Sequence, residues 1–406
     1  MMIGSIDLLG GKAVQLQQGD PSRKIHERAD VEALLDDFSL TGTVAVVDLD
    51  AALGRGSNAD LARRLCARAE VHMGGGIRDE ETARAYLRSG ARRLIIGTKA
   101  EPAFLSKFHP DHLLAALDFK GSEVVDRGWT KSTGESLMDR ARRLEPHVAG
   151  FLVTQVDREG LMGGFNMDPL RELRQFTDKI LIAAGGVSTV EEIRELSKIN
   201  IDVQLGMAVY DGRLELKSSF VELGDWSKGL LPAIAQDGQG RILMVGFASR
   251  EALDVTLKTR KATFFSRSKN RLWTKGETSG HVMTVRQVRW DCDRDTLLYL
   301  CEASGPACHF GTDTCFGPGQ SRLLESLASD IRSASARAGW TRKLMDDPQL
   351  LREKILEESA EVCDFTDKGN LAWEVADLLY HVAVLMEREG VTFDHVRHHL
   401  ASRRKP

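Results

Sequence analysis

Thiol side chains gather in one short stretch of the sequence. Four of the six cysteines, Cys292, Cys301, Cys308 and Cys315, fall within 24 residues. In a cytosolic chain such clustering favours metal binding over disulfide bonding. Cys292, Cys308 and Cys315 can supply three protein ligands to a catalytic Zn²⁺ and leave one position for water, whose pKa the metal would lower toward ~7. Cys301 lies in an apolar stretch and is expected in the core.

Carboxylates surround the first of these thiols. Asp291, Asp293 and Asp295 alternate along the chain, so in an extended segment they share one face while Cys292 points to the other. Three hard oxygen donors on one face suit Mg²⁺. On spacing alone an alternative stays open, in which the thiols are core residues and the aspartates form a polar turn.

A second acidic pattern follows toward the C-terminus. Glu358 and Glu361 lie three residues apart, and Glu374 and Asp377 repeat that spacing. Residues three apart share a helix face, so two antiparallel helices would present four carboxylates to one another. Such a cluster repels unless a cation joins it, and Mg²⁺ is the natural partner. Two solvated amphipathic helices are the alternative.

The elements that position these residues divide the chain into three blocks. Residues 1 to 221 alternate short β-branched runs with helical patterns and repeat internally at an offset close to 110 residues. This predicts a (β/α)8 TIM barrel built from two half-barrels, with its active-site loops at the carboxyl ends of the strands. The strands expected to be buried span residues 44–48, 93–97, 113–117, 151–154 and 180–184.

The remaining two blocks differ from the first, and from each other, in their expected secondary structure. Residues 222–317 show short strands (242–245, 262–265, 282–285 and 296–300) and one helix near 250–259, which predicts a small α+β zinc domain. Gly317-Pro318-Gly319 forms a linker. Residues 320–406 are almost all helical, with helices expected over 323–338, 348–367, 371–389 and from Phe393. A helical bundle of this size holds a small core and is expected to be oligomeric.

Composition limits the classes of partner. The formal net charge of −4 offers no basic field for nucleic acid. No apolar run approaches the ~20 residues that span a bilayer, and the N-terminus lacks an apolar signal segment. We therefore expect a cytoplasmic protein that acts on small molecules.

Four motifs in the second block are similar to those of phosphoribosyl-AMP cyclohydrolase: 266–268, 272–281, 291–295 and 307–309. The resemblance runs from about Leu230 to Phe316. It implies that Cys292, Cys308 and Cys315 bind zinc and that Asp291, Asp293 and Asp295 bind Mg²⁺. Water would open the adenine ring between N1 and C6, with His281 and His309 moving protons and the polar loop from Lys275 contacting substrate. It also implies a homodimer with the metal site at the subunit interface.

The third block resembles the all-α, MazG-like nucleoside-triphosphate pyrophosphohydrolases and, within them, phosphoribosyl-ATP pyrophosphohydrolase. The resemblance covers about Leu323 to Arg403. It implies that Glu358, Glu361, Glu374 and Asp377 hold Mg²⁺ and that Thr341 and Lys343 contact phosphate. The nucleotide product would be the substrate of the preceding domain, and the two C-terminal domains would form the homodimer. A general nucleotide pyrophosphatase beside a structural zinc module is the competing interpretation.

The first block resembles ProFAR isomerase through segments 6–8, 47–50, 74–78, 97–98, 128–129 and 185–187. Asp7 would be the general base and Asp118 its half-barrel counterpart. Glycine-rich turns ahead of helices expose backbone N–H groups and would bind a phosphate at each end of the substrate. The phosphate- and substrate-binding residues expected here are Gly75, Gly76, Gly97, Thr98, Gly185, Gly186, Gly206 and Trp129.

Three positions depart from the isomerase pattern. Gln15 and Met207 stand where the family has arginines, and neither can replace a bidentate arginine contact. Glu159 stands where the family has an acidic aspartate and could still act as an acid, one methylene farther out. Two readings of the barrel therefore stay open: an isomerase, or a non-catalytic module that supports the hydrolases or binds pathway metabolites.

Overall fold

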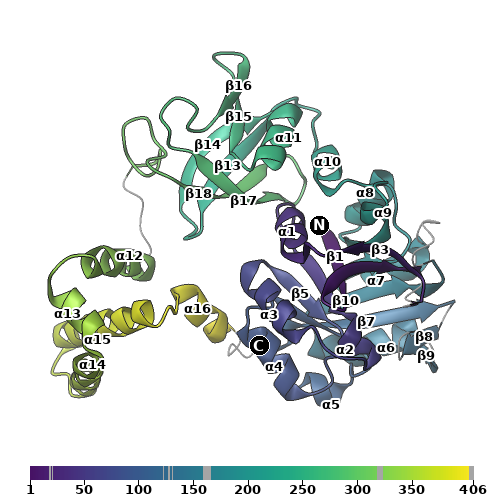
Figure 1. The fold of residues 1–406 in the computed structure, drawn as a ribbon, viewed down its shortest axis with the longest axis horizontal. Coiled ribbons are helices and arrows are strands. Elements are labelled where there is room, and N and C mark those ends of the chain that lie inside the picture. The colour runs from purple at the N-terminus through teal and green to yellow at the C-terminus, as the bar shows by residue number, and fades with distance from the viewer. Residues whose placement is uncertain are drawn as a thin grey trace. The chain divides into compact units, whose positions relative to one another are not determined.

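The computed structural model describes residues 1–17, 20, 22–121, 123–126, 129, 131–158, 166–317 and 323–401. It divides into two compact units, Met1–Gly317 and Pro318–Pro406. The first unit contains a barrel and a smaller α+β domain, and the second is helical (Figure 1).

Eight parallel strands close into a barrel in the N-terminal half, as predicted. Each strand pairs with its neighbour, and β10 pairs with β7 to complete the ring. The barrel strands are β1 (Met2–Leu9), β4 (Val44–Asp48), β5 (Val71–Gly74), β6 (Arg93–Ile96), β7 (Leu113–Lys120), β10 (Gly150–Gln155), β11 (Ile180–Ala184) and β12 (Asp202–Leu205).

Helices connect the strands and cover the outside of the barrel (Figure 1). Several begin at side-chain caps that the sequence carries: Asp79 accepts from the backbone N–H of Thr82, and Thr189 forms a capping box with Glu192. The helices are α1 (Val31–Phe38), α2 (Leu49–Leu53), α3 (Ala59–Arg68), α4 (Glu80–Arg88), α5 (Pro102–Leu105), α6 (Leu137–Leu144), α7 (Met167–Phe176), α8 (Val190–Lys198), α9 (Met207–Tyr210) and α10 (Leu216–Glu222), with short 3₁₀ turns η2 (Pro110–His112), η3 (Glu145–His147) and η4 (Val156–Arg158).

Two hairpins that the strand pattern did not predict follow the first and fifth barrel strands. Strands β2 (Lys12–Leu16) and β3 (Lys24–Arg28) come after β1, and β8 (Glu123–Asp126) and β9 (Lys131–Ser136) come after β7. Their equivalent positions agree with the two-half repeat in the sequence.

Both faces of the barrel strands are buried, which explains their nearly continuous apolar sequences. A small cluster fills the interior of the barrel and consists of Ile3, Ala45, Ile95, Leu114, Leu152, Ile182 and Ala184. A larger core lies between the strands and the surrounding helices and continues into the α+β domain.

The α+β domain is built on a four-stranded sheet of order β14-β13-β18-β17, with a separate hairpin of β15 and β16. Its helix α11 spans Arg250–Thr259, as predicted, and Ser249 caps its N-terminus. The strands are β13 (Leu231–Asp237), β14 (Ile242–Ala248), β15 (Thr263–Ser266), β16 (Arg271–Thr274), β17 (Met283–Trp290) and β18 (Leu297–Ala303).

The second unit consists of α12 (Leu323–Ser335), α13 (Trp340–Asp346), α14 (Pro348–Cys363), α15 (Lys368–Arg388) and α16 (Phe393–Ala401). Its core is small and centres on Ile331, Leu344, Leu351, Ala383 and Val384. The sequence did not predict α13 as a separate helix. In the part of the chain that the structure describes, no helix combines the length and hydrophobicity that crossing a bilayer requires.

Candidate active sites

A cavity of about 730 Å³ opens at the carboxyl ends of the barrel strands. It brings together nearly all the barrel residues that the sequence singled out. Its lining includes Asp7, Asp118, Trp129, Gly75, Gly76, Gly97, Thr98, Gly185, Gly186 and Gly206. This is the end of a (β/α)8 barrel at which active sites are found.

Paired glycines form matching turns in the two halves of the barrel. Gly75 and Gly76 have φ angles of 89° and 68°, and Gly185 and Gly186 have 91° and 90°. These left-handed conformations favour glycine. A Cβ on Gly75 would also meet the Asp48 carbonyl oxygen at 2.3 Å. Both turns precede a helix, so their backbone N–H groups are available to anions.

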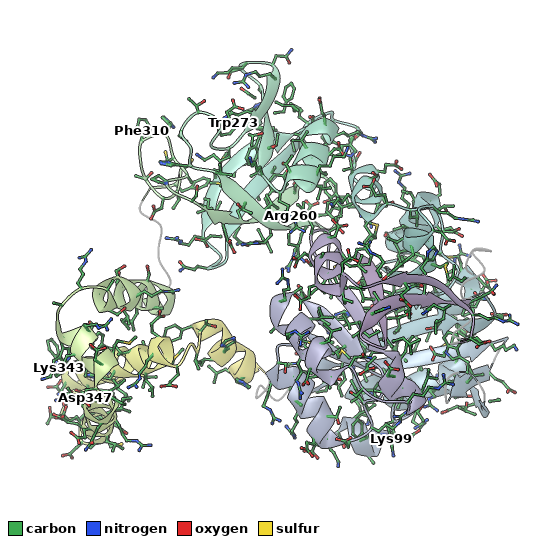
Figure 2. The ribbon with its side chains drawn as sticks, in the orientation of Figure 1. Lys99, Arg260, Trp273, Phe310, Lys343 and Asp347 are labelled. Atoms are coloured by element: carbon green, nitrogen blue, oxygen red, sulfur yellow. The ribbon has the colours of Figure 1, made fainter. Side chains whose placement is uncertain are left out.

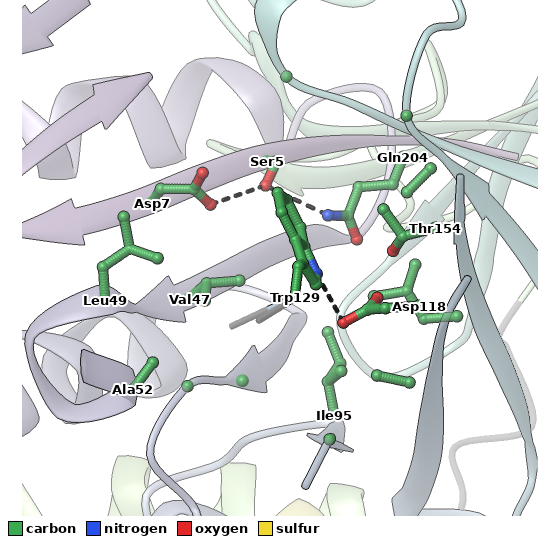
Figure 3. A pocket seen from close by; sticks show the side chains of 18 of the residues that line it. Ser5, Asp7, Val47, Leu49, Ala52, Ile95, Asp118, Trp129, Thr154 and Gln204 are labelled. Carbon is green, nitrogen blue, oxygen red and sulfur yellow. Dashed lines mark hydrogen bonds between the residues drawn. The ribbon is translucent and has the colours of Figure 1, made fainter. Parts of the chain in front are cut away.

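Asp7 and Asp118 occupy equivalent places in the two half-barrels. Each lies two residues before the end of its strand, β1 or β7. Ser5 donates a hydrogen bond to Asp7 at 3.3 Å, and the Trp129 indole N–H donates to Asp118 at 2.9 Å. Figure 3 shows the Trp129 ring between the two carboxylates. Burial raises the pKa of Asp7 from 3.8 to about 6.

Ser5 and Gln204 are cavity residues that the sequence analysis missed. Gln204 donates to the Ser5 hydroxyl at 3.3 Å, which joins β12 to β1 beside Asp7 (Figure 3). Ser5 lies two residues before Asp7, so strand periodicity already placed both on the same face.

The residues that depart from the isomerase pattern have different surroundings. Gln15 and Met207 both line the cavity and are buried. The Gln15 side chain lies against Gly206, where a Cβ would meet its Oε1 at 2.9 Å, and its Nε2 has no hydrogen-bond partner among the described residues. Glu159 lies outside the described residues.

The aspartates 291, 293 and 295 lie in a turn, and the extended segment expected for them was wrong. Strand β17 ends at Trp290, β18 begins at Leu297, and Arg294 adopts a left-handed φ of 64°. We call residues 291–296 the acid turn. The Asp291 carboxylate accepts from the backbone N–H groups of Asp295 and Thr296, both at 3.1 Å. Carboxylate oxygens of all three aspartates nevertheless lie within 4.8 Å of one another.

The three predicted zinc thiols separate into a pair and a single residue. Cys308 and Cys315 are within hydrogen-bonding reach of each other. Cys292 lies on the acid turn, 4.0 Å from Asp293 Oδ1, and does not form a ligand group with the other two. Hydrogen bonding from the backbone of Phe310 is the main factor that lowers the pKa of Cys308, whereas burial raises the pKa of Cys315.

Lys275 and His309 approach the thiol pair from two loops, and His281 follows Lys275 along the first of them. Lys275 is buried, and its charge acts on Cys315. His309 Nδ1 lies 3.9 Å from Cys308 Sγ, and Phe310 beside it is 82% exposed (Figure 2). His281 lies against Gly305, where a Cβ would meet its ring at 2.9 Å.

The helical unit brings three of the four predicted carboxylates together. Glu358 on α14 and Glu374 and Asp377 on α15 have carboxylate oxygens within 4.8 Å of one another. Glu361 is exposed beside them, and partial desolvation followed by the negative charge of Glu374 raises its pKa. His381, to which the sequence analysis gave no role, is buried with Nδ1 3.7 Å from Glu358, one turn beyond Asp377.

The two residues of the bundle that were expected to contact phosphate, Thr341 and Lys343, differ in their exposure to solvent. The Thr341 hydroxyl is buried and hydrogen-bonded to Tyr380 at 2.8 Å. Lys343 is exposed on the same helix, with its ammonium group 5.5 Å from the centre of the Trp340 ring (Figure 2).

Three family models match the chain in succession. The model described as histidine biosynthesis protein matches residues 1–215, that of phosphoribosyl-AMP cyclohydrolase matches 244–317, and that of phosphoribosyl-ATP pyrophosphohydrolase matches 324–404.

Curated relatives from distant organisms match as well. The histidine biosynthesis bifunctional protein HisIE of Vibrio cholerae is 42% identical over 196 residues, which cover 45% of this chain and 93% of the relative. HisIE of Escherichia coli K12 is 41% identical over 191 residues, covering 44% and 94%. The chloroplastic protein of Arabidopsis thaliana is 41% identical over 197 residues, covering 42% and 70%.

Proposed function

We propose that this chain performs three consecutive steps of L-histidine biosynthesis. It belongs to the histidine biosynthesis protein family and is a bifunctional hydrolase. The helical bundle hydrolyses phosphoribosyl-ATP to phosphoribosyl-AMP and pyrophosphate. The α+β domain opens the adenine ring of phosphoribosyl-AMP to give ProFAR. The barrel isomerises ProFAR, and the cavity that holds Asp7 and Asp118 between two glycine turns is the observation that carries this third step.

In the bundle, Glu358, Glu361, Glu374 and Asp377 hold Mg²⁺. The donor set fits this ion, because closely spaced carboxylates repel one another, and partial desolvation together with the charges of Glu374 and Glu358 raises the pKa of Glu361. When bound, Mg²⁺ supplies charge neutralisation to the triphosphate. Lys343 adds a positive charge for phosphate, and His381, whose Nδ1 hydrogen-bonds the Asp377 carbonyl oxygen at 2.9 Å, lies 3.7 Å from the Glu358 carboxylate.

In the α+β domain, Asp291, Asp293 and Asp295 hold Mg²⁺, and the thiols hold zinc across a homodimer. Cys308 and Cys315 of one copy form the pair, and Cys292 comes from the second copy. The separation of Cys292 within one chain supports this arrangement, and so do the exposed side chains of Phe310 and Phe316 beside the pair. Apolar side chains that gather on a surface, rather than standing singly, mark protein contacts.

Proton transfer in the ring opening falls to His281 and His309. When bound, zinc supplies the Lewis acidity that makes water nucleophilic at neutral pH. As water oxygen bonds to C6 and the C6–N1 bond breaks, one imidazole accepts a proton from water and the other donates one to N1. Lys275, buried beside Cys315, contacts the substrate.

In the barrel, Asp7 removes the C2 proton of the sugar and Asp118 carries a proton at the opposite side of the cavity. A pKa of about 6 leaves Asp7 mostly ionised at neutral pH, yet more basic than an ordinary carboxylate. Glycine turns at Gly75-Gly76 and Gly185-Gly186 bind the two phosphates. Glu159 is the remaining acidic candidate.

A single assay tests the whole proposal. Purified full-length chain is given phosphoribosyl-ATP, and every product is identified with time. Successive appearance of pyrophosphate, ProFAR and its ketose isomer supports all three steps. Accumulation of ProFAR in a preparation free of host isomerase would restrict the barrel to a scaffold, and a second substrate class cleaved equally well would favour a general nucleotide pyrophosphatase.

A further inference from the structure

The acid turn is held from outside its own sheet, by the last segment of the barrel. Trp290, the residue immediately before the turn, stacks on Phe220 of α10 with ring centres 5.4 Å apart and an angle of 19°. Its indole N–H donates to the Phe220 carbonyl oxygen at 3.1 Å. Trp226 also packs against Trp290, edge-on, with ring centres 5.9 Å apart. Trp290 is therefore fixed in position and in orientation.

The chain between these aromatic residues fits closely against the turn. A Cβ on Gly224 would lie 2.5 Å from Cη2 of Trp290, so a larger residue has no room there. The backbone N–H of Asp225 donates to the Arg294 carbonyl oxygen, at the centre of the acid turn, at 2.9 Å. Lys228 adds an ion pair to Asp295 at 3.2 Å.

The side chain of Arg294 also faces the barrel. Burial lowers the pKa of this guanidinium, and the charge of Arg194 on α8 acts in the same direction. The turn thus directs its carboxylates outward to solvent, where Asp291 and Asp293 are exposed, while its one arginine packs inward.

We propose that the segment Phe220–Trp226 positions the acid turn, and so the cyclohydrolase metal site, through its contacts with Trp290. This proposal rests on the proposed function. Three carboxylates held close together repel one another in the absence of a cation, so their convergence must be enforced by the surrounding structure. The barrel holds the acid turn in part of that arrangement and so contributes to the metal affinity of the neighbouring domain. This holds whether or not the barrel is itself catalytic.

The test measures binding of Mn²⁺ alone to the metal-free full-length chain, by electron paramagnetic resonance of the free ion. A background of Glu374→Gln with Asp377→Asn removes the bundle site. Gly224→Ala inserts a methyl group against Trp290, and Phe220→Leu removes the stacked ring without adding bulk. Arg289→Gln is the matched control, because it breaks a barrel contact, the ion pair with Glu70 at 2.9 Å, one residue from Trp290.

We expect Gly224→Ala and Phe220→Leu to weaken Mn²⁺ binding about tenfold, the size of effect typical of groups that orient metal ligands. In the bundle-intact chain, the Mg²⁺ concentration for half-maximal ring opening should rise by a similar factor, and excess Mg²⁺ should restore the rate. Affinities unchanged within twofold in Phe220→Leu would overturn the proposal. An equal loss in Arg289→Gln would overturn it as well, because any loosening of the domain contact would then suffice.

Asp293→Asn in the same background separates this proposal from the function on which it rests. If Asp293→Asn leaves Mn²⁺ binding unchanged, the acid turn is not a metal site and the proposed function fails there. If Asp293→Asn removes binding but Gly224→Ala and Phe220→Leu do not weaken it, the site stands and only the positioning role fails.

Discussion

Replacing Asp7 by asparagine should stabilise the barrel at neutral pH while removing any isomerase activity. Burial raises the pKa of Asp7 from 3.8 to about 6, so the folded state binds this proton more tightly than the unfolded chain does. Above pH 6 the folded protein must carry a buried charge that the unfolded chain carries in water. Asparagine has nearly the same shape, can still accept from Ser5 and carries no charge.

The size of the gain depends on pH. Each pKa unit is worth about 1.4 kcal/mol, so the ionised carboxyl costs the folded state up to about 3 kcal/mol at pH 7.5 and about 1 kcal/mol at pH 4.5. The first figure is an upper bound, because water in the cavity solvates part of the charge. Asp7→Asn should therefore raise the free energy of unfolding most at pH 7.5, with a gain that shrinks as the pH falls toward 4.

Hydrogen exchange of barrel peptides, corrected for intrinsic rates at pH 7.5 and 4.5, isolates this domain within the full chain. Asp48→Asn is the matched control at the end of the next strand. Asp48 accepts from Asn58 N and Nδ2, both at 2.7 Å, and from Ala51 N at 3.1 Å, so asparagine there should destabilise by about 1–3 kcal/mol. A loss of stability in Asp7→Asn at pH 7.5, or equal gains at both pH values, would refute the reasoning.

Three further outcomes are expected. Cys308→Ser should abolish ring opening and lower bound zinc while pyrophosphate release persists, and retention of both zinc and ring opening would disprove the ligand assignment. Asp377→Asn should stop pyrophosphate release from phosphoribosyl-ATP and leave phosphoribosyl-AMP turnover intact, because the carboxylates it weakens lie in a separate compact unit; joint loss of both rates would argue against independent sites. Gln15→Arg with Met207→Arg should tighten ProFAR binding by about 1.5–3 kcal/mol for each charge-assisted contact formed, as measured by calorimetry, and unchanged affinity would show that neither position faces a phosphate.

Much of the fold could be predicted from the sequence, because apolar runs and the residues that end them are visible within a few neighbouring positions. Strands β4 and β11 have the predicted bounds, and so does α11. In each case an apolar run is bounded by turn or capping residues. The hairpin β2–β3 gave no such signal, because β3 is mostly exposed and charged. Helix α13 was missed because it has only seven residues, between Gly339 and Asp347, which is too short for a clear helical pattern.

The sites were predictable to the extent that spacing along one element determines them. Glu374 and Asp377 share a helix face by their separation alone, and they converge with Glu358 as expected. Spacing could not tell that Cys292 lies apart from Cys308 and Cys315, because a turn and the tertiary path of β18 intervene. The stacking of Phe220 on Trp290 joins residues 70 positions apart, and local patterns carry no information about such contacts.

Strand β17 pairs with β18 along one side, and on its other side its first residues pair with 260–262, where the Val285 N–H donates to the Arg260 carbonyl oxygen at 2.7 Å. The later residues of β17 contact the barrel on that side, where the Leu40 carbonyl oxygen accepts from the Val288 N–H at 2.8 Å and the Ser39 carbonyl oxygen accepts from the Gln287 side-chain amide at 3.2 Å. Arg260 reaches the Asp36 carbonyl oxygen at the same junction (Figure 2). Unprotected edge strands pair with other chains and aggregate. A fragment that begins at residue 222 would therefore uncover the end of β17 that faces the barrel, together with Trp290.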